Sequence, residues 1–339
     1  MKERMGTWRR YTFSGVWILS SVGLGWQVVQ GRHTFDSPAT VPALLALLVC
    51  TAALLWWLAG MAPDVPSNTA RTRYGRFVLV VILGVGVLFP LRTLIGPPLL
   101  FALPVLGLAV LVLMRPRLSR LEVVYALLLA LVAGIAGLGA GWVTFPPLTW
   151  VSLQVALVLL SLLAGWSLLR HTGLLQAGIG RSLLVSEGPV PALRGFAQGI
   201  LIAVPWTFGL VLLGGANEET WVQSWWQPLL AIQPSISEEA WARVLLVPLL
   251  FLAFRPVAQG RTALTAAVVI MAYWFANLHT EGGPEAVLST VMIGTLFALP
   301  TSYLWLRRGL ETALGFHFWL DFVKFGVAYL LNHGLWLKS

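Results

Sequence analysis

Long apolar runs alternate with short polar stretches along the whole chain. About eleven apolar segments can be counted, at 11–30, 40–61, 77–91, 97–114, 121–140, 151–169, 196–214, 237–254, 262–279, 286–306 and 312–332. Most approach the ~20 residues that a helix needs to cross the apolar core of a bilayer. The runs are continuous and rich in Leu, Val and Ala, whereas the strands of a membrane barrel alternate apolar and polar residues. The pattern predicts an all-α, polytopic transmembrane bundle of about 10–11 segments.

The composition agrees with this fold class and excludes a soluble one. Hydrophobic residues make up 58% of the chain and charged residues 10%, against about 25% charged residues in a soluble domain. The formal net charge of +9 does not indicate a nucleic-acid partner, because most Lys and Arg residues lie in short clusters between apolar runs. The single cysteine, Cys50, can form no disulfide within the chain.

The connections between the apolar segments alternate between ones rich in Lys and Arg and ones poor in them. The N-terminus and residues 71–76, 115–120, 170–194, 255–261 and 307–308 are basic, and the connections between them are poor in Lys and Arg. Basic loops stay in the cytoplasm. We therefore expect a multi-pass protein of a bacterial plasma membrane, with a cytoplasmic N-terminus and a first apolar run that is retained as a span.

The polar interruption at 170–195 predicts a division of the chain. It mixes Leu with Arg, which is typical of a connector lying along a membrane surface. Residues 1–169 carry few carboxylates and form an N-terminal transmembrane region of unknown role. Residues 196–332 hold the groups that can carry chemistry, and we expect them to form the functional domain.

The first such group stands at the head of segment 237–254. Glu239 and Arg243 are four residues apart, so in a helix they share a face and can pair. Glu238 lies about 100° around the helix from Glu239 and faces elsewhere, which makes it a candidate general base. The alternative is an ordinary helix N-terminus, with Ser237 as the N-cap and the two acids complementing the helix dipole.

The other groups are two histidines and an aspartate. His279 lies four residues after Phe275 at the end of an apolar run, where an interfacial histidine is the alternative. His317 and Asp321 share one face of segment 312–332, with a purely structural His–Asp hydrogen bond as the alternative. A carboxylate facing lipid is costly, so this face should look into the protein.

The predicted topology places these groups at different membrane faces. His317 lies ~12 Å into its helix, while Glu238 and His279 enter from the opposite side. They can meet only if their helices begin or end inside the protein, which is possible where the backbone lines a cavity.

The order E-E-x-x-x-R, F-x-x-x-H and H-x-x-x-N/D resembles the CAAX-prenyl-protease-related intramembrane protease family (CPBP, also called ABI), which includes the type II CAAX prenyl endopeptidases. Glu238, Glu239 and Arg243 match the first motif, Phe275 and His279 the second, and His317 and Asp321 the third. The similarity covers roughly residues 196–332. Asp321 stands where the family often has Asn.

The resemblance implies hydrolysis of a peptide bond within the membrane. Glu238 would activate a water with His279 as its partner, Glu239 and Arg243 would brace Glu238, and His317 and Asp321 would bind the developing oxyanion or orient the group that does. The substrate would be a membrane protein or peptide, lipidated in the eukaryotic members. The resemblance favours a reaction without a metal cofactor, and zinc held by two histidines and a glutamate is the alternative.

Two other functions stay open. The chain could be a non-catalytic membrane scaffold of the same family. It could also be a transporter that uses the buried Glu, His and Asp groups as an ion pathway. Transporters often contain repeated halves, and the first half of this chain has no counterpart of the 238–243 or 317–321 pattern, which argues against transport.

Overall fold

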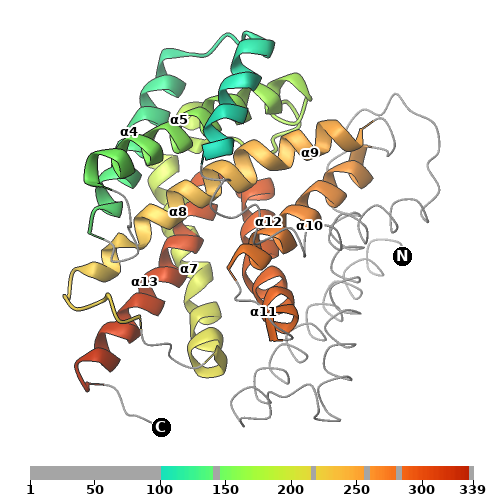
Figure 1. The fold of residues 1–339 in the computed structure, drawn as a ribbon. Coiled ribbons are helices and arrows are strands. Elements are labelled where there is room, and N and C mark those ends of the chain that lie inside the picture. The colour runs from blue at the N-terminus through green and yellow to red at the C-terminus, as the bar shows by residue number, and fades with distance from the viewer. Residues whose placement is uncertain (1–100, 140–145, 215–218, 256–259, 280–284, 336–339) are drawn as a thin grey trace, which may run out of the picture. The chain divides into compact units, whose positions relative to one another are not determined.

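The computed structural model describes residues 101–139, 146–214, 219–255, 260–279 and 285–335, which are drawn as coloured ribbons in Figure 1. These residues are largely helical and include no strand, so the predicted all-α fold is confirmed for this part of the chain. The predicted segments 11–30, 40–61 and 77–91, together with Cys50, lie outside the described residues.

Each predicted apolar segment from 97–114 onward coincides with a helix or with a run of continuous helices. In chain order these are Phe101–Met114, α4 (Arg120–Gly137), α5 (Pro147–His171), α6 (Leu183–Glu187), α7 (Pro189–Gly214), the 3₁₀-helix η1 (Gln227–Ala231), α8 (Ile232–Glu238), the π-helix η2 (Glu239–Leu246), α9 (Val247–Phe254), α10 (Gly260–Leu278), α11 (Glu285–Ile293), the π-helix η3 (Gly294–Ala298), α12 (Leu299–Arg308) and α13 (Leu310–Asn332). The main differences are at the starts: α7 begins at Pro189 rather than at 196, and α8 begins at Ile232, directly after η1, rather than at 237.

Five of the described helical stretches are long and apolar enough to cross a membrane: Arg120–Gly137, Pro147–His171, Gly260–Leu278, Ser289–Arg308 and Leu310–Asn332. The protein is therefore an integral, multi-pass membrane protein. Its bacterial origin and the cytoplasmic position of its N-terminus remain predictions.

The chain divides into two compact units. The first comprises residues 1–90, 209–215 and 254–300, and the second comprises residues 91–208, 216–253 and 301–339. The predicted boundaries at 169 and 195 were drawn from charge and composition, and they remain a prediction.

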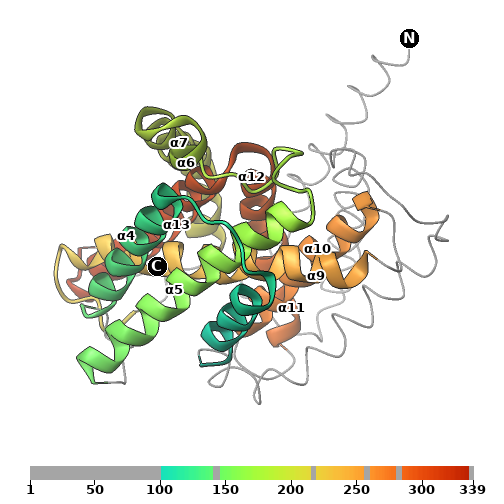
Figure 2. The ribbon, with the colours of Figure 1, turned by 90° about the horizontal axis from the view of Figure 1, so that it is seen from above.

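Within the second unit, glycines bring α5 close to two neighbours. Figures 1 and 2 show α4 and α5 side by side. A Cβ atom on Gly134 of α4 would lie 3.2 Å from a Val155 methyl group of α5. Further along α5, a Cβ on Gly165 would overlap the carbonyl oxygen of Val244 in η2. Small residues are the usual means by which membrane helices approach so closely.

α7 and α13 also touch backbone to backbone in the second unit. A Cβ on Gly199 would overlap the carbonyl oxygen of Thr312, and a Cβ on Gly315 would overlap that of Phe196. Both positions therefore require glycine. Gly315 lies two residues before His317, so this contact fixes α13 next to that histidine.

Part of the predicted connector is attached to the start of α13 by a buried carboxylate. Glu311 is only 3% exposed and accepts hydrogen bonds from Ser182 Oγ (2.6 Å), the Leu183 amide (2.8 Å) and the Leu184 amide (3.1 Å). It thereby satisfies amides that the first turn of α6 leaves without helical partners. The predicted position of this stretch along the membrane surface remains a prediction.

Candidate active site

The two adjacent glutamates lie inside a continuous helical run and not at its beginning. α8 passes directly into the π-helix η2, whose first residue is Glu239, and η2 passes into α9. Ser237 does not cap a helix: its Oγ accepts a hydrogen bond from Gln233 Nε2 at 3.1 Å. The alternative of an N-terminus capped by Ser237 is therefore wrong, because the helix already begins at Ile232. Short π-helical turns are frequent at functional sites.

Glu239 and Arg243 form an ion pair inside the protein. Arg243 Nη1 lies 3.2 Å from Glu239 Oε1, and both side chains are almost completely buried. The predicted pairing is thus confirmed. Arg243 also donates from Nε to Ser302 Oγ of α12 at 3.4 Å. Each of these buried charges depends on the other, because a single buried charge without its partner is strongly destabilising.

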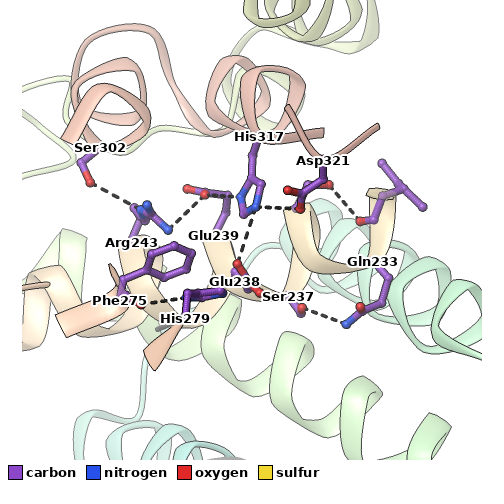
Figure 3. A network of polar contacts seen from close by, with 12 residues as sticks. Gln233, Ser237, Glu238, Glu239, Arg243, Phe275, His279, Ser302, His317 and Asp321 are labelled. Atoms are coloured by element: carbon purple, nitrogen blue, oxygen red, sulfur yellow. Dashed lines mark hydrogen bonds and ion pairs between the residues drawn. The ribbon is translucent and has the colours of Figure 1, made fainter. Parts of the chain in front are cut away.

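His317 stands between carboxylates of two helices, as Figure 3 shows. Its Nδ1 lies 2.8 Å from Glu239 Oε1. Its Nε2 lies 3.3 Å from Asp321 Oδ2 and 3.5 Å from Glu238 Oε2. A neutral imidazole donates through only one nitrogen, so the contacts on both sides are satisfied together when both nitrogens carry protons. The shared face of His317 and Asp321 is confirmed, and the contact with Glu239 was not foreseen.

Burial separates the members of this cluster into two sides. Glu239, Arg243, Ser302 and His317 are all buried. The side chains of Glu238 and Asp321 remain 20% and 22% exposed. The imidazole is therefore held from the buried side through Nδ1 and turns Nε2 towards the two carboxylates that are partly exposed.

His279 belongs to the first unit and is held by its own helix end. It follows the last turn of α10, is exposed, and places Nδ1 2.7 Å from the carbonyl oxygen of Phe275. The two rings are tilted against each other with their centroids 4.3 Å apart, and Phe275 stacks in turn on Phe297 of η3. A carbonyl oxygen only accepts, so Nδ1 carries the proton and Nε2 is the basic nitrogen of the neutral ring. The approach of His279 to Glu238 and His317 remains a prediction.

The donor set of the second unit does not fit a metal site. Among the described residues no group of three or more His, Cys, Asp or Glu side chains is arranged to hold a metal ion. Oε1 of Glu239 is already shared by Arg243 and His317, and a guanidinium competes with a metal ion for that carboxylate. The preference for a metal-free reaction over zinc stays a prediction.

Two polar groups near the cluster were missed from the sequence. Ser302 lies in the Thr–Ser pair at 301–302, and both residues are completely buried. Gln154 of α5 accepts a hydrogen bond from Gln233 Nε2 at 3.4 Å. Gln233 lies one helical turn before Ser237. The available signal was the presence of uncharged polar residues inside apolar segments, which is unusual unless they have partners within the bundle.

The comparison with protein families bears on this same stretch of chain. Residues 219–323 match the family model described as "Type II CAAX prenyl endopeptidase Rce1-like". This segment resembles the Rce1-like family. No curated protein and no solved structure matches the chain.

The Rce1-like segment contains all six candidate residues and confirms the resemblance drawn from the three motifs. It begins at Glu219, before η1, and ends inside α13. The Rce1-like family is a family of proteases, which supports peptidase activity within a membrane at the level of the family.

Proposed function

We propose that the protein is an intramembrane endopeptidase that hydrolyses a peptide bond of a membrane-associated protein or peptide with a glutamate-activated water. The observation that carries the proposal is the partly accessible Glu238 carboxylate, 3.5 Å from Nε2 of an imidazole that Glu239 holds from the buried side. Such a pair offers a proton acceptor and a proton donor at one place. The match of residues 219–323 to a protease family supports the same proposal.

Glu238 is the general base. It takes a proton from a water, whose oxygen forms a bond to the carbonyl carbon of the substrate. The same carboxyl then gives that proton to the leaving amine as the C–N bond breaks, so the proton balance closes on one side chain. Its partial exposure allows the water to reach it, whereas Glu239 is already committed to Arg243 and His317.

His317 donates from Nε2 to the oxygen that becomes negative in the tetrahedral intermediate. A donor fixed before the reaction stabilises the developing charge without reorganisation, and such stabilisation often accelerates a reaction more than any other single effect. Glu239 fixes the ring by accepting from Nδ1, and Arg243 balances the charge of Glu239. Asp321, one turn further along α13, also contacts Nε2 of His317. It holds the ring in place until the substrate carbonyl binds.

His279 is assigned by the family motif as the second contact of the water. Its hydrogen bond to the Phe275 carbonyl supports this assignment, because it leaves Nε2 as the accepting nitrogen. The reaction needs no metal or organic cofactor. The substrate is embedded in the bilayer. Comparing prenylated and unprenylated peptides determines whether it must carry a lipid group.

The test measures cleavage of a membrane peptide by the purified protein in liposomes, with prenylated and unprenylated forms of the peptide compared. Glu238→Gln removes the base while keeping the size of the side chain, so cleavage should fall at least a hundredfold. Glu187→Gln is the matched control, because Glu187 is a half-exposed partner of Arg181 at the end of α6. Its activity should stay within about twofold of the parent.

Retained cleavage in Glu238→Gln would remove Glu238 from the mechanism. Full inhibition by a chelator, reversed by added zinc, would overturn the metal-free reaction. If the parent protein cleaves no peptide, proton-driven uptake of solutes into the same liposomes would favour the transporter, and the absence of both activities would favour the scaffold.

A further inference from the structure

The π-helix η2 is contacted from two sides by residues that the reaction scheme does not use. On one side, the absence of a side chain at Gly165 allows the backbone of α5 to lie against the carbonyl group of Val244. On the other, Ser302 of α12 accepts from Nε of Arg243 at 3.4 Å. Val244, Arg243 and Ser302 are all completely buried. These contacts come from elements far apart in the sequence and meet on one turn of helix.

The contact with Ser302 controls the direction of the Arg243 side chain. The guanidinium group is planar and rigid, so a bond to Nε fixes the plane in which its other nitrogens lie. In that plane Nη1 lies 3.2 Å from Glu239 Oε1, and the same oxygen lies 2.8 Å from His317 Nδ1. A continuous series of contacts therefore runs from Ser302 to the imidazole, as Figure 3 shows.

The contact with Gly165 controls the place of the turn itself. A Cβ atom at this position would overlap the carbonyl carbon and oxygen of Val244, the residue directly after Arg243. Backbone atoms cannot move aside as a flexible side chain can. Any larger residue at 165 must displace η2 from α5, and with it both members of the Glu239–Arg243 pair.

We propose that Ser302 and Gly165 are positioning residues that hold η2 from two sides, so that Glu239 keeps its contact with His317. The catalytic consequence rests on the proposed function. The structural consequence does not, because the hydrogen bond between Glu239 and His317 can be observed without any substrate.

The first test compares two buried serines. Ser302→Ala removes the acceptor for Arg243, and Ser161→Ala is the matched control, because Ser161 Oγ is buried with no hydrogen-bond partner among the described residues. The readout is the ¹⁵N and ¹H resonance of His317 Nδ1 in protein labelled at histidine, assigned with the variant His317→Gln. The resonance should move in Ser302→Ala and stay in place in Ser161→Ala. An identical spectrum for the two variants would overturn the proposal.

Kinetics supply a second, separate readout. Ser302→Ala should lower kcat about tenfold, since the lost hydrogen bond has a charged donor. KM should be unchanged, because Ser302 does not contact the substrate in the proposed scheme. A kcat equal to that of Ser161→Ala would remove Ser302 from the reaction. If the parent protein cleaves nothing, the proposed function fails, and the histidine resonance still decides whether Ser302 positions His317.

The second test compares two helical glycines. Gly165→Ala should move the His317 resonance and lower the thermal midpoint. Gly326→Ala is the control, because a Cβ at Gly326 of α13 meets nothing within 4 Å. If the spectra and melting curves of the two variants coincide, Gly165 has no positioning role.

Discussion

The carboxylate–histidine cluster of the second unit and the His279 motif of the first hold their imidazoles by opposite means. His317 is buried and bound through charged side chains from η2 and α13, and both of its nitrogens face carboxylates. His279 is exposed and is held by the backbone carbonyl and the ring of Phe275, within its own helix end. The first arrangement requires tertiary packing, whereas the contact of His279 with Phe275 is local.

The difference separates stability from activity. Variants in the buried cluster should damage both, because each leaves a charged or polar group without its partner inside the protein. Variants at His279 should damage activity far more than stability, because the ring is exposed. The following predictions test this distinction, beginning with the largest expected change in stability.

Arg243→Met should have the largest effect. It leaves Glu239 buried without its guanidinium, and breaking a buried pair in this way costs about 3–5 kcal/mol. The double variant Glu239→Gln/Arg243→Met should recover part of this loss, since no isolated charge remains. Thermal unfolding in mixed micelles measures both. A single variant that melts with the parent protein would show that the pair is not buried.

His317→Gln should lower both the stability of the fold and the rate of cleavage. An amide cannot bridge Glu239 and the other two carboxylates as a doubly protonated ring does, so about 1–3 kcal/mol of stability should be lost. Cleavage should fall at least a hundredfold. Full activity in a stably folded His317→Gln protein would contradict the role of His317 as the oxyanion donor.

His279→Gln should lower the rate of cleavage while leaving the stability of the fold nearly unchanged. The change in unfolding free energy should stay within about 1 kcal/mol, as for most exposed positions, while cleavage falls roughly a hundredfold. The ratio of lost activity to lost stability should therefore be far greater than for His317→Gln. Similar ratios for the two histidine variants would contradict the distinction drawn between the two regions.

Lys324→Gln should have the smallest effect. Lys324 lies on α13 beyond Asp321 and pairs with Glu219 at 2.7 Å, with half of its side chain exposed. Such a pair contributes about 0.2–1 kcal/mol, and added salt should reduce the contribution further. The variant and the parent should melt together at high salt. A loss as large as that of Arg243→Met would show that this pair belongs to the buried cluster.

The fold of the described residues could be predicted from hydropathy because the lipid restricts the alternatives so strongly. The pairs Glu239–Arg243 and His317–Asp321 could be predicted as well, because helical periodicity places residues four apart on one face. In both cases the controlling interactions are local. The start of α8 at Ile232 was missed because Gln233, Pro234 and Ser235 read as a polar connection, although they are buried in a helix that packs inside the protein.

Contacts between distant segments could not be predicted. Glu239 and His317 are 78 residues apart, and no spacing rule indicates that Glu239 should contact His317. The π-helical form of η2 also has no signal in the pattern of apolar residues. Glu311 has no signal in the sequence that marks it as a buried cap, and only the packing of α6 against α13 reveals this role.

The backbone contact between α7 and α13 has a consequence for lipids. Because Gly199 and Gly315 leave no space between the two helices, neither can slide past the other without parting the pair. A thicker or thinner bilayer should thus be met by a common tilt of both helices, since tilting is a usual response to hydrophobic mismatch. The depth of the His317 imidazole beneath the lipid headgroups would then depend on membrane thickness through two helices moving as one.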